Sequence, residues 1–196
     1  MRKARRPAAI ALALALALQL GAAVPAAAAD ITATAGYENG NSPLNLTQIA
    51  RYTSGQFNVD GGVMEIVAYN RANSFAYAIN GQSGLLAAIS LENLAAGSSV
   101  ARLSGTDIDV KALVEAADSS FRYGDMTSVA VSPDSATLAA ALQAEGYNDA
   151  GRVALFTCNS DGTLTLKGLV ETGVQPDMVT FADNNTCLLY TSDAAD

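Results

Sequence analysis

The sequence predicts an all-β protein, an incomplete β-propeller of about three blades of short antiparallel strands. Two observations support this fold class. Short apolar runs rich in Val, Ile, Leu, Tyr and Phe alternate with turn sequences, which is typical of short strands joined by tight turns. A similar strand recurs around Ile66, Val129 and Val179, and unequal spacings near about 50 residues suit four-stranded blades with variable loops. A sandwich of short strands is the structural alternative, and the repeat favours the propeller.

The expected strands fall into three groups along the chain. Residues 46–52, 65–70, 75–80 and 85–91 form the first group; 100–103, 128–131, 138–143 and 153–158 form the second; 164–172 and 178–181 form the third. Two Ala-rich stretches also have helix propensity. We interpret 136–144 as a strand, because it follows a Ser-Pro-Asp-Ser turn directly after another strand. For 110–117 a short helix and a turn within a loop both remain open.

The first 29 residues have the three parts of a secretory signal peptide. Arg2, Lys3, Arg5 and Arg6 give a positive start, residues 10–20 are almost all Ala and Leu, and an Ala-x-Ala site ends at Ala29. A membrane-spanning anchor would need about 20 apolar residues, more than this stretch offers, and no later segment is long or apolar enough to span a bilayer. We therefore expect cleavage before Asp30 and a secreted, extracellular or cell-surface protein.

Composition narrows the possible partners and chemistries. The net charge is −8, and the signal carries four of the basic residues and none of the acidic ones, so the remainder carries −12. Nucleic acid and anionic lipid are thus not expected as partners. The acidity indicates either a well-solvated surface, which we favour, or cation binding. The chain contains no His and no Trp. The absence of His excludes catalysis by a His base and zinc binding through imidazole, while catalysis by carboxylates or Tyr remains open.

The last ten residues of the sequence are expected to be foreign to the protein. Residues 187–196, CLLYTSDAAD, resemble the translation of a transposase adaptor used in DNA library preparation. We therefore expect them to be an artefact on a truncated reading frame. Residues 30–43, rich in Gly, Asn, Thr and Ala, are expected to be a flexible segment, and 44–186 the N-terminal part of the propeller. Cys158 is then the one authentic cysteine, expected as a small buried hydrophobe rather than as half of a disulfide with Cys187.

The first blade carries a recognisable set of residues. The stretch 46–81, LTQIARYTSGQFNVDGGVMEIVAYNRANSFAYAING, resembles the opening of the choice-of-anchor I domain family, and 127–131 and 175–181 resemble its next two blades. The resemblance implies a large secreted or surface propeller, bacterial in appearance. It ends just after Phe181, so we expect later blades and a C-terminal anchor that are not in this sequence, and the type of anchor cannot be assigned.

Acidic residues lie at or near the starts of the expected inner strands. Glu65, Asp125 and Asp177, with Ser128, would crowd the mouth of a central channel, where converging carboxylates could hold calcium through six to eight oxygens. The alternative, which we favour, is that such residues accept hydrogen bonds from backbone amides in turns. No catalytic residue, cofactor site or confident metal ligand is assigned. Asp161-Gly162 is interpreted as a hairpin turn, and serine hydrolysis lacks a His partner.

Two classes of function follow. The chain is either a secreted or surface binding and scaffold module, whose blade loops contact a protein, small-molecule or glycan ligand, or part of a calcium-dependent phosphoesterase resembling propeller phytases and alkaline phosphatases. The second class would need carboxylates from the missing blades. The first is preferred, without enzymatic activity in this fragment. An open array of about three blades leaves sheet faces uncovered, so the isolated fragment is expected to aggregate or to stay partly unfolded.

Overall fold

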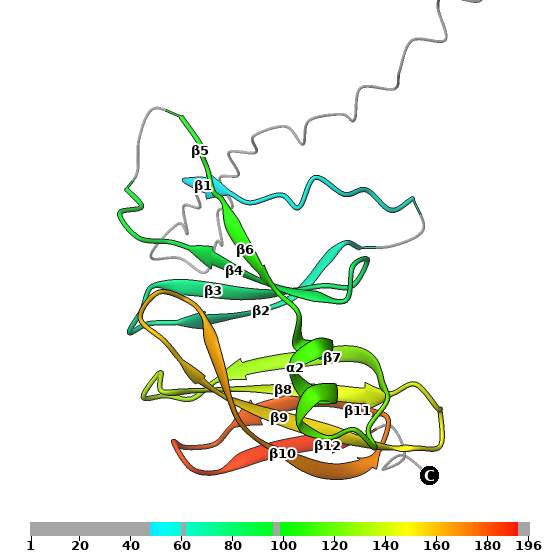
Figure 1. Ribbon diagram of the computed structural model, residues 1–196. Helices are drawn as coiled ribbons and strands as arrows, with labels where there is room; N and C mark the ends of the chain where they lie inside the picture. Colours follow the sequence, from blue (N-terminus) through cyan, green and yellow to red (C-terminus); the bar gives the residue numbers. More distant parts are fainter. Residues whose placement is uncertain (1–47, 60–61, 96–98, 192–196) are drawn as a thin grey trace, which may run out of the picture. The chain divides into compact units, whose positions relative to one another are not determined.

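The computed structural model describes residues 48–59, 62–95 and 99–191 of the 196-residue chain. The predicted signal peptide and the flexible segment 30–43 lie outside these residues. Within them the chain is all-β, with antiparallel four-stranded sheets and one α-helix (Figure 1), which confirms the predicted fold class. The described part contains no helix that is both long and apolar enough to cross a bilayer.

The first four-stranded sheet is an antiparallel meander. Its strands follow the order β2-β3-β4-β6, with bounds Met64–Asn70, Phe75–Asn80, Leu85–Ser90 and Gly105–Ile108. The first three match the predicted strands to within one residue at each end. The fourth strand, β6, was not predicted, because Gly105-Thr106-Asp107 has almost no apolar content. It pairs with β4 and forms the outer edge of the sheet.

The second sheet repeats this arrangement. Its order is β10-β9-β8-β7, and along the chain the strands are Tyr123–Val131, Thr137–Ala144, Ala150–Cys158 and Leu164–Val174. The Ala-rich stretch is strand β8, as predicted, because its alanines pack between two neighbouring strands and are buried on both faces of the sheet. Asp161-Gly162 forms the turn between β9 and β10, where Gly162 has a φ of 83° that favours glycine.

Two further strand pairs complete the described part. β11 (Pro176–Phe181) pairs with β12 (Cys187–Thr191), which covers part of the stretch predicted to be an adaptor artefact; that origin stays a prediction. β1 (Ala50–Arg51) runs parallel to β5 (Ala101–Arg102). Parallel pairing of these two segments was not predicted, since it joins residues far apart in the sequence.

Residues 110–117, for which helix and turn both remained open, form the helix α2 (Val110–Ala117). The Asp109 carboxylate caps it by accepting a hydrogen bond from the Ala112 N–H at 2.9 Å. Val110 and Val114 are fully buried on one side of the helix. The helix follows β6 and connects the first sheet to β7, the start of the second sheet.

The first strands of the three sheets, β2, β7 and β11, occupy equivalent places and contact one another in order. Each has a bulge near its start, and Val67, Val129 and Val179 hold similar places in their hairpins, where they pair with Ala78, Ala140 and Leu189. The predicted repeat is therefore present, but its alignment was wrong by one residue in the first sheet: Val67, not Ile66, is the equivalent of Val129. A register slip of one residue moves a side chain to the other face of a sheet.

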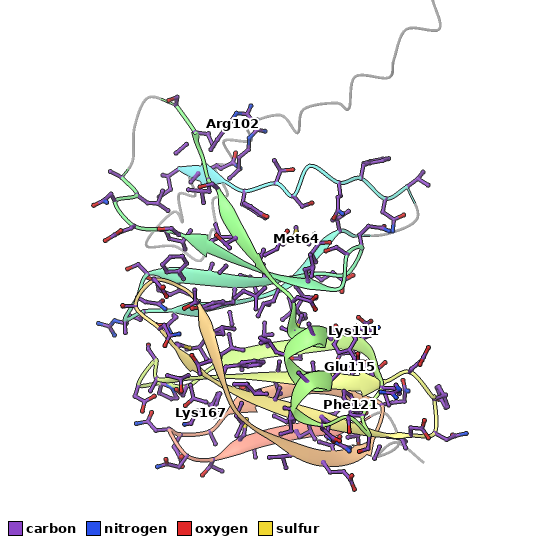
Figure 2. The ribbon with its side chains drawn as sticks, in the orientation of Figure 1. Met64, Arg102, Lys111, Glu115, Phe121 and Lys167 are labelled. Carbon is purple, nitrogen blue, oxygen red and sulfur yellow. The ribbon has the colours of Figure 1, made fainter. Side chains whose placement is uncertain are left out.

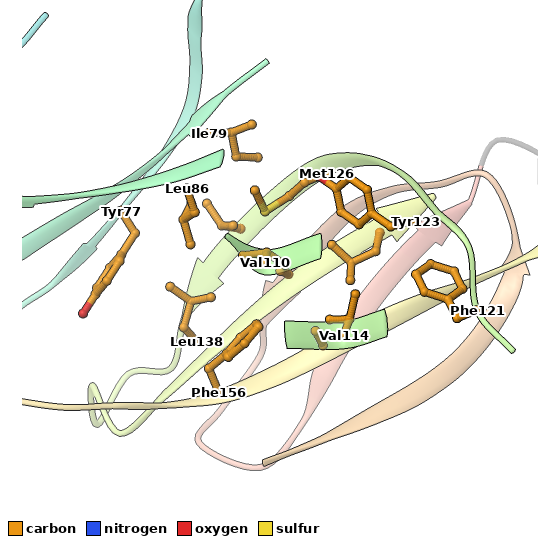
Figure 3. Packing of buried hydrophobic residues seen from close by; sticks show 14 of the residues in the cluster. Tyr77, Ile79, Leu86, Val110, Val114, Phe121, Tyr123, Met126, Leu138 and Phe156 are labelled. Atoms are coloured by element: carbon orange, nitrogen blue, oxygen red, sulfur yellow. The ribbon is translucent and has the colours of Figure 1, made fainter. Parts of the chain in front are cut away.

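The main core lies between the first two sheets and includes α2. Figure 3 shows Tyr77 and Leu86 of the first sheet extending toward Leu138 and Phe156 of the second, with Val114 beside them. A second cluster joins Val179 of β11 to Ala139, Ala141 and Val153 of the second sheet. Successive sheets thus bury apolar faces against one another, as blades do in a propeller. The number of blades in the whole ring stays a prediction.

Buried polar bonds accompany this packing. The Asn70 side chain, fully buried, donates to the Ser135 carbonyl at 2.8 Å and so joins the first two sheets. The Val179 N–H donates to the Ser128 hydroxyl at 3.2 Å, and the Thr127 hydroxyl donates to the Pro176 carbonyl at 2.7 Å. Because an unpaired buried polar group is costly, these bonds fix which sheet faces which.

The guanidinium group of Arg152 connects the end of α2 to the second sheet. It lies 3.1 Å from the Asp118 carboxylate and 3.2 Å from the Glu171 carboxylate, and it stacks over the Phe121 ring at 5.1 Å. The Ser120 hydroxyl and N–H, followed by Arg152, hold the pKa of Asp118 below its usual value. Arg152 is mostly buried, so this arrangement satisfies its charge and is structural.

Candidate functional site

A cleft of about 540 Å³ opens at the end of the sheets where β2 and β7 begin. It lies between the β3–β4 turn, the start of β7 and the N-terminal turn of α2. Most of its walls carry polar or charged groups; it is lined by Gly81, Gln82, Ser83, Gly84, Leu85, Asp109, Lys111, Tyr123, Gly124 and Asp125. We treat this cleft as the candidate functional site.

The β3–β4 turn forms one wall and is held by its own hydrogen bonds. The Asn80 side-chain oxygen accepts from the N–H groups of Gln82 and Ser83, each at 3.2 Å. The Asn80 amide nitrogen in turn donates to the Gln56 side chain at 2.9 Å. Gly84 has a φ of 69°, a conformation that side chains other than Gly rarely adopt. The turn therefore presents its Gln and Ser side chains to the cleft from a fixed backbone.

The start of β7 forms the opposite wall and is anchored by Tyr123. Its ring belongs to the main core, and its N–H donates to the Glu115 carboxylate at 3.0 Å. Burial raises the pKa of the Tyr123 hydroxyl, and the nearby carboxylates of Asp125 and Asp109 raise it further. The hydroxyl is therefore neutral and lies 3.5 Å from the Gly84 carbonyl on the other wall.

Three charged side chains of the cleft come from two elements. Asp125 stands exposed on β7, and its carboxylate accepts the Met126 N–H at 2.8 Å. Asp109 is engaged as the cap of α2, and Lys111 follows it on the helix, where Figure 2 labels it together with Glu115. The cleft thus combines carboxylate acceptors with an ammonium donor, an arrangement suited to hydrogen bonding with a polar ligand.

Of the three predicted acidic residues, two border this cleft. Asp125 lines it directly. The Glu65 carboxylate lies against Gly81 of the cleft wall, so closely that a β-carbon added to Gly81 would come within 2.8 Å of it. Asp177 stands exposed on β11 and is not among the lining residues. The structure therefore brings Glu65 and Asp125 to the same end of neighbouring sheets, and Asp177 remains separate from the cleft.

A metal site would need more ligands than the described residues bring together. In residues 48–59, 62–95 and 99–191, no three His, Cys, Asp or Glu side chains are grouped as a metal ion requires. Ser128, also considered at the channel mouth, is buried and accepts the Val179 N–H. Calcium binding at Glu65, Asp125 and Asp177, the alternative that the sequence did not favour, stays untested.

Sequence reasoning missed several residues of the cleft, among them Asp109, Lys111 and Tyr123. The turn at 80–84 was recognised, but nothing in the sequence indicated that it would face the start of β7. The two cysteines lie elsewhere. Cys158 is half-buried and free, with a pKa raised by burial, and Cys187 is exposed and free.

Comparison with known proteins decides the family. The family model of the choice-of-anchor I domain matches residues 65–195, which is more than half of the chain. The chain belongs to the choice-of-anchor I domain family. The resemblance seen in the first blade is thereby confirmed, and membership of this family places the chain among secreted or surface proteins.

Solved structures give a more distant likeness. A candidate 6-phosphogluconolactonase from Bacteroides uniformis ATCC 8492 is 21% identical, with a TM-score of 0.49. The match covers 67% of this choice-of-anchor I chain and 34% of the other chain, so the chain spans about a third of the length of that protein. A search of curated proteins found no match.

Proposed function

We propose that this choice-of-anchor I chain is part of a secreted or cell-surface β-propeller that acts as a binding and scaffold module. The observation that carries the proposal is the polar cleft at one end of the first two sheets, built by turns and strand starts rather than by strand centres. Loops on a rigid scaffold are the usual place for binding residues. Family membership supports a location outside the cytoplasm.

The chemistry of the cleft favours a glycan as the ligand. Asp125 offers carboxylate oxygens, Lys111 an ammonium group, and Gln82 and Ser83 an amide and a hydroxyl. Sugar hydroxyls both donate and accept hydrogen bonds, so they can use all of these groups at once. An anionic ligand would meet Asp109 and Asp125 and is disfavoured by their charge.

The first prediction concerns binding at this cleft. The mature chain is expected to bind a subset of glycans on an array, and Asp125→Asn is expected to weaken that binding about 10- to 100-fold, because hydrogen bonds to a charged group are worth about 1.5–3 kcal/mol. The measurement is array signal followed by titration calorimetry with the best glycan. Asp107→Asn makes the same charge change at an exposed residue of β6 outside the cleft and should leave affinity unchanged.

Absence of glycan binding, or equal losses in the Asp125 and Asp107 variants, would contradict this assignment. The phosphoesterase alternative has a different outcome. If the chain bound calcium stoichiometrically and hydrolysed p-nitrophenyl phosphate only with calcium present, and if Glu65→Gln abolished both, that alternative would replace the binding module. Glu65 is chosen for the phosphoesterase test because it is one of the three acidic residues considered as calcium ligands. Its carboxylate borders the cleft at Gly81 but does not line it, so this test is separate from the glycan test at Asp125.

The second prediction concerns export. Expressed with its own first 29 residues in a bacterial host, the chain should leave the cytoplasm and begin at Asp30, as read by N-terminal sequencing. Residues 26–28 and 27–29 both form an Ala-x-Ala site, so replacing Ala28 and Ala29 together by Leu should block cleavage at both and accumulate the precursor. Ala26→Leu leaves the site that ends at Ala29 intact and should be cleaved normally. An intact Met1 in a cytoplasmic product would contradict the export prediction.

A further inference from the structure

A tyrosine hydroxyl and a backbone carbonyl meet across the cleft. The Tyr123 hydroxyl, from the start of β7, donates to the Gly84 carbonyl of the β3–β4 turn over 3.5 Å. Both residues line the cleft. The turn belongs to the first sheet and Tyr123 to the second. The two walls therefore present one hydrogen-bond donor and one acceptor to each other, close enough for a single small group to contact both.

Both groups are held in place by bonds to residues that do not line the cleft. Tyr123 is 6% exposed, its ring packs in the main core, and its N–H donates to the Glu115 carboxylate at 3.0 Å. The Gly84 N–H donates to the Asn80 carbonyl at 2.8 Å. Groups that are fixed before a ligand arrives lose little conformational freedom on binding, so contacts with them contribute more to affinity.

The bond between the two groups is long enough to be replaced. Most O–H···O bonds are about 2.7–2.8 Å long, whereas this one is 3.5 Å. An oxygen about 2.8 Å from each group would fit between them, accepting the Tyr123 hydrogen and donating its own to the Gly84 carbonyl. A ligand would thereby exchange one long bond for two bonds of ordinary length.

Only some chemical groups can make both of these bonds. A hydroxyl group donates and accepts, an ether oxygen or a carboxylate only accepts, and an ammonium group only donates. The Tyr123 hydroxyl itself remains a donor at neutral pH, because burial, followed by the carboxylates of Asp125 and Asp109, raises its pKa. The pair of groups is therefore complementary to a neutral hydroxyl.

We propose that Tyr123 and Gly84 together recognise one hydroxyl group of the glycan, which donates to the Gly84 carbonyl and accepts from the Tyr123 hydroxyl. This inference rests on the proposed function, because it names the part of the ligand that determines specificity at the same cleft. Tyr123 is then a specificity-determining residue. Its ring stabilises the core, and its hydroxyl selects ligands by the hydroxyl group that they carry at one position.

The test is a double-mutant cycle between the protein and the ligand. The mature wild type and Tyr123→Phe are titrated calorimetrically with the best glycan of the array and with its monodeoxy and mono-O-methyl derivatives, one for each hydroxyl. Tyr123→Phe keeps the buried ring, so its thermal melting should match wild type. It should weaken binding of the parent glycan about 3- to 10-fold, the range for one neutral hydrogen bond. Tyr147→Phe removes the hydroxyl of an exposed tyrosine outside the cleft and should leave affinity unchanged.

The expected result is coupling at a single position of the glycan. There, removal of the ligand hydroxyl should cost wild type about 3- to 10-fold more than it costs Tyr123→Phe, and at every other position the two costs should be equal. O-methylation of the same hydroxyl should weaken binding to both proteins, because an ether cannot donate to the Gly84 carbonyl. Wild-type tolerance of methylation at every hydroxyl overturns the inference.

A further outcome separates this inference from the function on which it rests. If wild type binds a glycan and Asp125→Asn weakens that binding, but Tyr123→Phe shows no coupling or equal coupling at all positions, the binding module stands and the role of Tyr123 is overturned. Equal coupling would mean that the substitution only loosens the wall of the cleft. If wild type binds no glycan, both proposals are overturned.

Discussion

Phe156→Ala is expected to lower the free energy of unfolding by about 3–5 kcal/mol, the range for truncation of a buried aromatic ring. Phe156 is fully buried on β9 and belongs to the cluster between the first two sheets. Its removal leaves a cavity beside Leu138 and Val114, which adds to the lost transfer energy of the ring. Because a domain of this size is stabilised by only about 5–15 kcal/mol, much of the population would unfold at moderate temperature.

Urea titration followed by circular dichroism measures this change. Tyr147→Ala removes an aromatic ring of similar size from a site that is 74% exposed, and it should cost less than about 0.5 kcal/mol. If the two variants had similar midpoints, the sheets would not be packed through Phe156 as described.

Asn70→Asp is the second substitution with a large expected effect, about 2–4 kcal/mol at neutral pH. The native side chain accepts hydrogen bonds from the N–H groups of Ala72 and Asn73 and donates one to the Ser135 carbonyl. Aspartate keeps the two acceptor bonds but replaces the donor with a charged oxygen that faces a carbonyl. The buried charge and the lost bond both weaken the connection between the first two sheets.

The pH dependence identifies this cause. Repulsion from the Ser135 carbonyl favours protonation, so the folded pKa of the new carboxyl should exceed its unfolded value of about 3.9. The extra protonation stabilises the folded variant fully below the unfolded pKa and is lost as pH rises through the folded pKa. The difference from wild type should therefore shrink in acid. Asn93→Asp, at an exposed turn, should show neither the loss nor its pH dependence.

The elements that sequence predicted well are those whose stability is local. The strand Phe75–Asn80 has its predicted bounds because turn sequences flank an apolar run on both sides. β7 begins at Tyr123, five residues before its predicted start. Gly124 and Asp125 are poor strand formers, but β8 pairs Tyr123 and Asp125 on either side of a bulge at Gly124. The repeat was misaligned by one residue in the first sheet because Ile66 and Val67 are both apolar. Only the bulge in β2 decides which of the two lies on the sheet face that is equivalent to the Val129 face of the second sheet.

The candidate site was predictable only in part, for a related reason. Glu65 and Asp125 were placed at strand starts by the repeat, and strand starts do meet at one end of the sheets. Asp109 and Lys111 depended on residues 110–117 being a helix, which composition alone left open. The pairing of the β3–β4 turn with the start of β7 is a tertiary contact between the first two sheets, and no local pattern encodes it.

The parallel contact between β1 and β5 affects the order in which the molecule can assemble. The strands of the second sheet follow one another along the chain, and those of the first are interrupted only by β5, but Ala50 meets Ala101 only after the whole of β2, β3 and β4 has been made. At a synthesis rate of about 5–20 residues per second, the segment ending at Arg51 waits roughly 3–10 seconds for its partner. During that interval the Ile49 and Arg51 carbonyls have yet to meet the Ala101 and Leu103 N–H groups whose hydrogen bonds they accept in the folded chain, which is the stage at which a chaperone would have most reason to hold it.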